Sequence, residues 1–264
     1  MSAPVSAVLL AGGRTTKPFF PGDVPGYKAL MPLLGRSLQD WTLSAVAAAP
    51  SVTEILLVGP EAVTGAPAIT RAVQPVAAPG GFLANILAGL EAADSERVLF
   101  VNSDAPLLRP EMVEDFLQRA PAEADVVVSA AERGSLDRLP RRPHKPFRRF
   151  ADGAYAHGNF FLVNHRERDL DLLHRSLDKM YGRRKLAILA AAALGPGFFL
   201  WFLWRCVITH RARLTEMVER AASLLGVRAS VVVSPYAEIA LDVDEPKDYA
   251  FARALLEEAD SVAA

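Results

Sequence analysis

The sequence predicts an α/β protein built on a doubly wound, mostly parallel sheet with helices on both faces. Apolar runs alternate with helical patterns along the first half of the chain, which is typical of βαβ units. The runs VLL, ILLV, VLFV and VVV are continuously apolar, as strands covered on both faces are. The length of 264 residues suits one large core, and we expect a single domain over residues 1–264.

The expected elements follow from these patterns in chain order. Strands are predicted at VSAVLLAG, EILLVG, RVLFVNSD and ADVVVSAA, and helices near Ser37 to Ala48, near Ala84 to Ala93 and from Pro110. A returning strand at YAHGNFFLVN, two short strands in RASVVVSPYAEIALDVD and a helix with Pro246 near its first turn complete the fold. A basic, proline-rich loop or short edge segment at about 132–151 and an apolar helical insertion at about 183–213 interrupt the pattern.

Charge and cysteine content narrow the class of protein. The 29 basic and 30 acidic residues give a net charge of -1, so no whole-protein field attracts nucleic acid and none is expected as a partner. The single cysteine, Cys206, excludes an internal disulfide framework and a cysteine-based zinc cluster. No basic region precedes the first apolar run after Met1, so we expect a chain that is not exported and lies in the cytoplasm.

The first predicted strand ends in a candidate phosphate loop. In AVLLAGGR two glycines and Arg14 follow the strand, which leaves backbone N–H groups free to face an anion without obstruction by Cβ atoms. Lys28 follows after a spacer, and its compact ammonium could reach the same phosphates. A tight turn and a solvated lysine are the alternatives at this point.

Acidic residues follow two later strands. Asp104 stands at the carboxyl end of RVLFVNSD, where open α/β sheets bind ligands. Asp242 and Asp244 lie in IALDVDEPKDY, and we expect their side chains to diverge so that only one is a direct metal ligand. Carboxylates together with nucleotide phosphates suit a hard cation, Mg²⁺ or Mn²⁺.

LAGGR and KALMPLLGRSL resemble motifs of the nucleotidyltransferase superfamily, in particular its molybdenum-cofactor-guanylyltransferase-like NTP transferase domain. The resemblance implies a Rossmann-like, GT-A-type fold and a phosphate-contacting Lys28. It implies that the triphosphate is bound by the loop Leu10, Ala11, Gly12, Gly13 and Arg14. VDEPKDY matches the family's VDTPEDL, which implies Asp104 and Asp244 as metal ligands and Asp242 as an indirect or loop residue.

Two further segments match the family. APGGFLANILAGLEAA resembles its glycine-rich turn and helix start that contact the base, here carried by Gly80, Gly81 and Asn85. Close packing of small residues explains these positions equally well. HGNFFLV resembles the strand that faces the acceptor, which makes Asn159 a candidate for substrate binding, with His157 beside it.

The function implied is transfer of a nucleoside monophosphate from an NTP to a small or lipid-linked phosphorylated acceptor, with release of pyrophosphate. Lys28, Arg14 and Asp104 are the expected catalytic residues, acting by orientation and charge neutralisation. A glycosyltransferase that uses a nucleotide sugar is one alternative, because the D-x-D pattern at Asp242 to Asp244 occurs in that class. A non-catalytic nucleotide-binding module at a membrane surface is the other.

The apolar insertion carries 19 residues without charge, from Leu186 to Trp204, between RRK and Arg205. Length alone would allow a membrane span. A single crossing would, however, separate Asp244 from Lys28 and Asp104 and destroy the predicted site. A buried core, a homodimer face and a peripheral membrane contact through residues 186–208 stay open.

Overall fold

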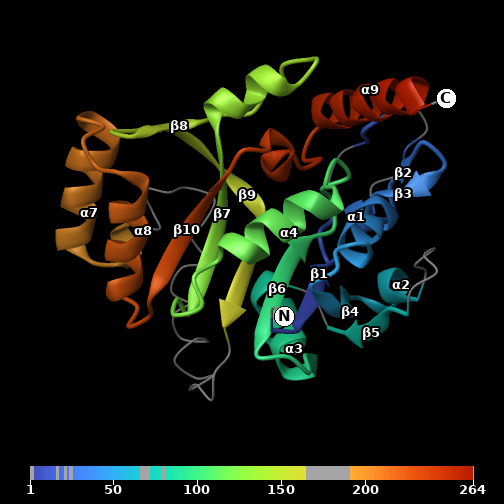
Figure 1. The fold of residues 1–264 in the computed structure, drawn as a ribbon, viewed down its shortest axis with the longest axis horizontal. Coiled ribbons are helices and arrows are strands. Elements are labelled where there is room, and N and C mark those ends of the chain that lie inside the picture. The colour runs from blue at the N-terminus through green and yellow to red at the C-terminus, as the bar shows by residue number, and fades with distance from the viewer. Residues whose placement is uncertain are drawn as a thin grey trace.

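The computed structural model describes residues 3–15, 18–20, 23, 26–65, 72–78, 81–164 and 191–263. Within them an eight-stranded sheet runs in the order β10-β7-β9-β6-β1-β4-β5, with β8 paired to β9 (Figure 1). Neighbouring strands are parallel except at β9, which is antiparallel to β6, β7 and β8. The strands are β1 (Val5–Leu10), β4 (Val52–Gly59), β5 (Gln74–Ala77), β6 (Arg97–Asn102), β7 (Val126–Glu132), β8 (Arg148–Phe150), β9 (Gly153–Asn164) and β10 (Ala229–Ser234). A hairpin of β2 (Pro32–Leu33) and β3 (Arg36–Ser37) lies outside this sheet.

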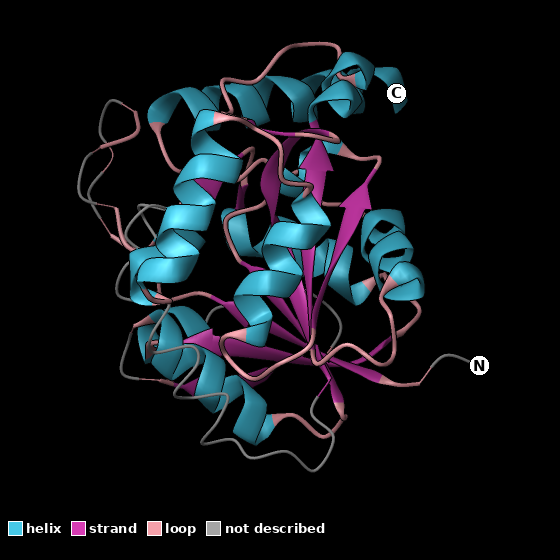
Figure 2. Cartoon of the chain, turned by 90° about the vertical axis from the view of Figure 1, so that its left-hand side faces the viewer, coloured by secondary structure: helices cyan, strands magenta, loops and turns pink. Residues whose placement is uncertain are grey.

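Helices lie on both sides of the sheet, as Figure 2 shows. Leu9 of β1 belongs to one apolar core together with Leu43 and Phe116, whereas its neighbour Val8 belongs to a second core with Ile86. The two cores exist because successive side chains of a strand point to opposite faces. The α-helices are α1 (Leu38–Ala47), α2 (Glu61–Thr64), α3 (Phe82–Ala92), α4 (Pro110–Arg119), α7 (Pro196–Phe202), α8 (Leu214–Ser223) and α9 (Pro246–Ala263).

The predicted architecture is confirmed. Helix α1 begins where the sequence indicated, because the Ser37 hydroxyl accepts the Asp40 N–H and the Asp40 carboxylate accepts the Ser37 N–H, which together form a capping box. Helices α3, α4 and α9 and strand β9 also lie where they were expected. Strand β5 was not predicted, because its sequence QPVA contains a proline and suits only an edge strand.

The prediction of two short strands between residues 228 and 244 is wrong for the second strand. Strand β10 ends at Ser234, before Pro235, which has no N–H to continue the ladder. A short 3-10 helix, η4 (Ala237–Ala240), follows and buries Ile239 against the sheet. Residues 241–245 then run without regular structure to α9.

Both interrupting segments contain secondary structure. Residues 132–151 hold the end of β7, the 3-10 helix η2 (Arg133–Arg138) and β8. In the apolar insertion, α7 passes directly into a π-helix, η3 (Leu203–Ile208), and Arg183, Arg184, Lys185 and residues 186–190 lie outside the described residues. Among the described helices, none combines the length and the apolarity needed to cross a membrane.

Candidate functional site

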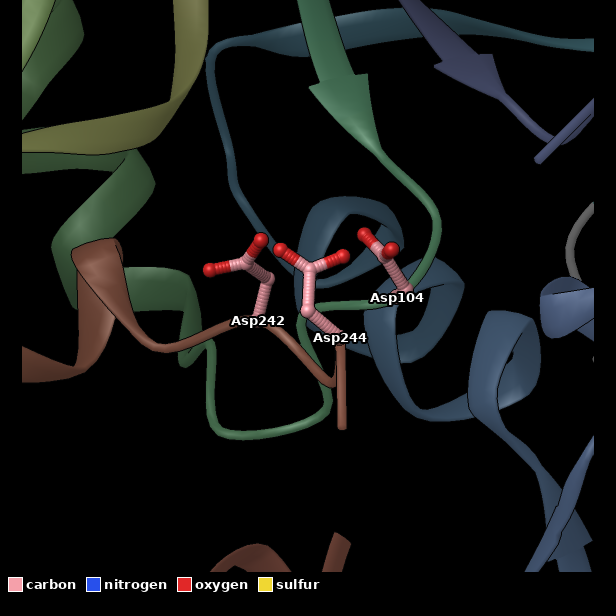
Figure 3. A group of neighbouring side chains, drawn as sticks. All are labelled: Asp104, Asp242 and Asp244. Atoms are coloured by element: carbon pink, nitrogen blue, oxygen red, sulfur yellow. The ribbon is translucent and has the colours of Figure 1, made fainter. Parts of the chain in front are cut away.

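Three aspartates from two distant parts of the chain meet beyond the carboxyl end of β6. Asp104 follows β6 by two residues, and Asp242 and Asp244 precede α9. Their carboxylate groups offer oxygens that all lie within 4.8 Å of one another, and Figure 3 shows the three side chains next to each other. The backbone holds the two segments together, because the Val243 N–H donates to the Asp104 carbonyl at 2.9 Å. Hard oxygen donors in this arrangement suit Mg²⁺ or Mn²⁺.

The expectation that Asp242 and Asp244 diverge is wrong. Alternate residues of an extended segment point to the same side, and here both carboxylates face Asp104 while Val243 between them is buried in the apolar core. The D-x-D spacing was therefore the signal that could have placed Asp242 beside the other two acids.

Lys28 supplies the positive charge among these acids. Its Nζ donates to Asp104 Oδ2 at 3.1 Å and also to Asp244 Oδ1. Burial alone would lower the pKa of Lys28, but the charges and hydrogen bonds of Asp104 and Asp244 outweigh burial and raise that pKa well above its usual value. Lys28 is therefore a fixed ammonium at the edge of the acid cluster.

The long spacer before Lys28 is closed at its base by backbone pairing. The Lys28 N–H donates to the Gly13 carbonyl at 2.9 Å, and the Thr15 N–H donates to the Gly26 carbonyl at 2.8 Å. Arg14 forms an isolated bridge with Tyr27, and its guanidinium lies 4.7 Å from the centroid of the Tyr27 ring. These hydrogen bonds bring Lys28 back beside the glycine loop. Next to them the exposed Arg14 stacks on the ring of Tyr27.

The carboxyls of Asp104 and Asp244 differ in their ionisation. Burial raises the pKa of Asp104, and the nearby Lys28 charge only partly offsets this effect. At Asp244 burial also favours the neutral form, but the Lys28 hydrogen bond and charge prevail and lower its pKa. The negative charge of Asp104 is therefore poorly stabilised by the protein alone, and a cation bound at the cluster would stabilise it.

The glycine loop after β1 contacts the start of α3. A Cβ atom placed on Gly12 would lie 2.7 Å from Asn85 Nδ2, so a side chain at position 12 would collide with Asn85. Asn85 is buried, and its Oδ1 has no hydrogen-bond partner among the described residues. Gly81 caps α3 with φ of 91°, in the left-handed region that favours glycine, whereas Gly80 lies outside the described residues. Leu10 is the last residue of β1, and Ala11, Gly12 and Gly13 follow it without regular structure; Leu10 and Ala11 are buried.

Asn159 lies on β9 beside the end of β6. Its Oδ1 accepts a hydrogen bond from Asn102 Nδ2 at 3.1 Å, and its Nδ2 has no partner in the described part of the chain. Asn102 stands two residues before Asp104, so this amide pair connects the antiparallel strand to the acid cluster. His157 lies nearby on β9, with its side chain exposed.

The first comparison with known proteins concerns the family. A model of the MobA-like NTP transferase domain matches residues 7–229. The chain belongs to the MobA-like NTP transferase family. The resemblance predicted from LAGGR and KALMPLLGRSL is therefore confirmed, and with it the assignment to the nucleotidyltransferases. The matched residues include Lys28 and Asp104 but end before Asp242 and Asp244, whose place in the site rests on the geometry.

Solved structures of similar fold agree with the family. A hypothetical transferase from Thermus thermophilus is 31% identical with a TM-score of 0.73, over 93% of this chain and 99% of that one. A 2-C-methyl-D-erythritol 4-phosphate cytidylyltransferase from the same organism is 19% identical with a TM-score of 0.54, over 96% and 99%. A nucleotidyl transferase from Methanothermobacter is 20% identical with a TM-score of 0.54, over 97% and 99%. No curated protein matched the chain.

The acid cluster borders a cavity of about 520 Å³ between the basic segment and α9. Asp242, Asp244 and two further acids line it, and Lys145 and Lys247 bring ammonium groups to it beside His144. Lys145 is bound to Asp242 by an ion pair. His144 and Lys145 were not predicted as site residues, because residues 132–151 were interpreted as an exposed loop or short edge segment; the density of basic residues in that segment was the available signal.

Proposed function

We propose that this NTP transferase is a Mg²⁺-dependent cytoplasmic enzyme that moves a nucleoside monophosphate from an NTP to a phosphorylated acceptor, with release of pyrophosphate. The observation that carries the proposal is the convergence of Asp104, Asp242 and Asp244 with Lys28 beside the glycine loop. A phosphate loop, a fixed ammonium and a cluster of hard oxygen donors are the parts that phosphoryl chemistry requires.

The acid cluster fits a divalent cation. Three carboxylates with oxygens within 4.8 Å of one another repel each other unless positive charge lies among them. Lys28 is bound to Asp104 and Asp244 and Lys145 to Asp242, and a divalent cation would share or replace these contacts. Asp104 and Asp244 would hold the ion, and Asp242 would join them. When bound, Mg²⁺ would neutralise negative charge on the triphosphate.

The chain's own residues would orient the reactants. Backbone N–H groups of Gly12, Gly13 and Arg14 would hold the triphosphate, and Lys28 would exchange a carboxylate for a phosphate oxygen. An oxygen of the acceptor phosphate would then attack the α-phosphorus, while the bond from this phosphorus to the bridging oxygen breaks and pyrophosphate leaves. The acceptor phosphate is already ionised, so no side chain has to remove a proton.

The cavity beside Asp242 and Asp244 is the place proposed for the acceptor. Lys145 and Lys247 line it together with four carboxylates, and their ammonium groups would contact an anionic group such as a phosphate monoester once a bound cation neutralises the acids. Asn159 lies beside the end of β6, and its buried Nδ2 has no hydrogen-bond partner among the described residues. This group would donate a hydrogen bond to a hydroxyl of a bound substrate.

The test is a nucleotide screen followed by an assay of turnover. The four NTPs are added with Mg²⁺, with CTP first because a structure of similar fold is a cytidylyltransferase. A nucleotide present at about 100 times its Kd should stabilise the protein by about 2.7 kcal/mol in thermal unfolding. Pyrophosphate release is then measured against a panel of phosphate monoesters.

Two outcomes separate the proposal from its rivals. Release of a nucleoside diphosphate from a nucleotide sugar, without pyrophosphate release from any NTP, would establish a glycosyltransferase. Nucleotide binding that Asp104→Ala and Lys28→Ala leave unchanged, with no turnover against any acceptor, would favour a non-catalytic module. In either case the roles assigned to Lys28 and the acids would be wrong.

A further inference from the structure

The helix formed by α7 and η3 carries an apolar stripe on its exposed side. Leu200, Trp204 and Ile208 recur at every fourth residue and are 64%, 60% and 57% exposed. Residues two positions away, Phe198, Phe202 and Cys206, are buried in a core with α8 and the sheet. The helix is therefore apolar on two opposite sides, although only one side is covered by the described residues.

The stripe is unusual for this molecule. Among the described residues, Leu224 is the only other large hydrophobic residue in the exposed class, at 51%, and it lies at the end of α8. Isolated exposed leucines are ordinary, whereas three aligned large side chains form a patch. Figure 1 shows α7 and α8 side by side at the outer end of the molecule, far from α9, so the patch is not part of the nucleotide site.

Exposed cations follow the carboxyl end of the helix that carries the stripe. Arg211 and Arg213 are exposed immediately after η3, and Arg205 donates to the Arg211 carbonyl at 3.1 Å, which holds the turn against the helix. Arg205 also lies 3.6 Å from Glu216. A row of apolar side chains that includes an exposed tryptophan, next to arginines, is the arrangement with which helices lie in the headgroup region of a bilayer.

We propose that the stripe of Leu200, Trp204 and Ile208, together with Arg211 and Arg213, binds the surface of a bilayer that contains anionic phospholipids. The apolar side chains enter the boundary between headgroups and acyl chains, and the arginines meet lipid phosphates. The enzyme is then held at the membrane surface through α7 and η3 without crossing it.

Self-association through the same face is disfavoured by charge. A twofold interface brings the same patch of two subunits together, so both copies of Arg211 and Arg213 would add positive charge to one interface. A bilayer with anionic lipids supplies charges of the opposite sign. This complementarity selects the bilayer over a second copy of the chain.

The experiment is cosedimentation of the full chain with vesicles of phosphatidylcholine alone or mixed with phosphatidylglycerol. We expect binding to the mixed vesicles that weakens as salt is added. The variant Leu200→Ser/Trp204→Ser/Ile208→Ser should lower the apparent affinity at least about tenfold. Arg211→Gln/Arg213→Gln should lower it roughly tenfold, as expected from about 1 kcal/mol for each cation near the surface.

Leu224→Ser is the matched control, because it removes one exposed leucine from another surface and should leave vesicle binding unchanged. Tryptophan emission should shift to shorter wavelength on the mixed vesicles, and Trp204→Phe should remove most of that shift. Thermal unfolding and pyrophosphate release in solution are measured on every variant, so a folding defect or a failure of the proposed chemistry is seen separately.

Three results would overturn the proposal. The first is that the full chain does not sediment with the mixed vesicles. The second is that it sediments equally well when the stripe is replaced by serines. The third is a dimer in solution that the serine variant dissociates, which would show that a second copy occupies the stripe.

Discussion

The acid cluster and the α7–η3 helix depart from ordinary burial in opposite directions. At the acid cluster the side chains of Lys28 and Asp104 are only 15% and 16% exposed although both are ionisable. On α7 and η3 large apolar side chains face solvent. Both arrangements are unfavourable for folding alone, because charges prefer water and apolar surface avoids it. Each is therefore expected where a ligand completes the surface, and the two ligands differ in chemistry.

The two regions are also held in place by different forces. Backbone hydrogen bonds join distant segments at the acid cluster, as between Lys28 and Gly13 and between Val243 and Asp104. The stripe is positioned by packing of its opposite side, where Phe198 and Phe202 are buried. Changes at the acid cluster should therefore affect turnover while the fold persists, and changes at the stripe should leave both the fold and turnover intact.

The largest expected effect is at Asp104. Asp104→Asn should lower kcat about 10³-fold, because it removes one charge from the cluster that would hold the cation. The same change should raise the free energy of unfolding at neutral pH by on the order of 1 kcal/mol. Burial raises the pKa of Asp104, so the folded state binds more protons than the unfolded state above the ordinary carboxyl pKa, and stability falls as pH rises through that range. The increase in the free energy of unfolding caused by Asp104→Asn should therefore shrink as pH is lowered toward the ordinary carboxyl pKa. Urea unfolding of the variant and the wild type at several pH values measures this difference.

Asp244→Asn gives the contrast in stability. The pKa of Asp244 is lowered in the folded protein, so its charge contributes stability that is present above the ordinary carboxyl pKa and lost as pH falls. This variant should unfold more easily than the wild type at neutral pH. If both variants change the free energy of unfolding in the same direction, Asp104 and Asp244 do not differ in environment as the structure indicates.

The fold could be predicted from the sequence to the extent that local patterns determine it. The continuous apolar runs predicted β1, β4, β6 and β7, and the helical pattern near Ser37 to Ala48 predicted α1. Strand β5 and the segment after β10 were not predicted correctly, because prolines weaken the strand pattern of QPVA and end the ladder at Pro235. Sheet order depends on contacts between distant residues and is not written in any single segment.

The candidate site could be predicted only in part for the same reason. The glycine loop and Asp104 follow strand ends, where the pattern of a doubly wound sheet places ligands. Lys145 lies on an irregular segment, so only the tertiary structure brings it to Asp242. The position of Arg14 likewise follows from its pairing with Tyr27, which no local pattern specifies.

A smaller effect separates two aromatic residues of the α7–η3 helix. Phe202→Ala should lower the free energy of unfolding by about 3 kcal/mol, because Phe202 is 4% exposed and the substitution leaves a cavity. Trp204→Ala, two residues away on the exposed side, should change it by less than about 0.5 kcal/mol. Both variants are compared with the wild type by urea unfolding without vesicles. A large loss for Trp204→Ala would show that the stripe is already covered in the free protein.

The smallest expected effect concerns competition between Lys28 and a metal ion. The Lys28 ammonium is hydrogen-bonded to Asp104 and Asp244, so a divalent cation that enters the cluster meets a like charge or must displace it. Lys28→Met removes this charge and keeps the apolar stem of the side chain. It should tighten the binding of Mn²⁺ in the absence of nucleotide about tenfold. The repulsion between two unit charges at such distances near a protein surface exceeds the free energy of a tenfold change in affinity. Mn²⁺ binding can be measured by electron paramagnetic resonance.

Lys247→Met is the matched control for Lys28→Met. Lys247 lines the cavity beside the acid cluster but pairs with Glu245, so its substitution should change the affinity for Mn²⁺ much less. If the two variants bind Mn²⁺ with equal affinity, Lys28 does not compete for the cluster, and its contact with the acids would be structural. Tighter binding in Lys28→Met together with loss of turnover would instead show that the ammonium yields to the metal and acts on the nucleotide.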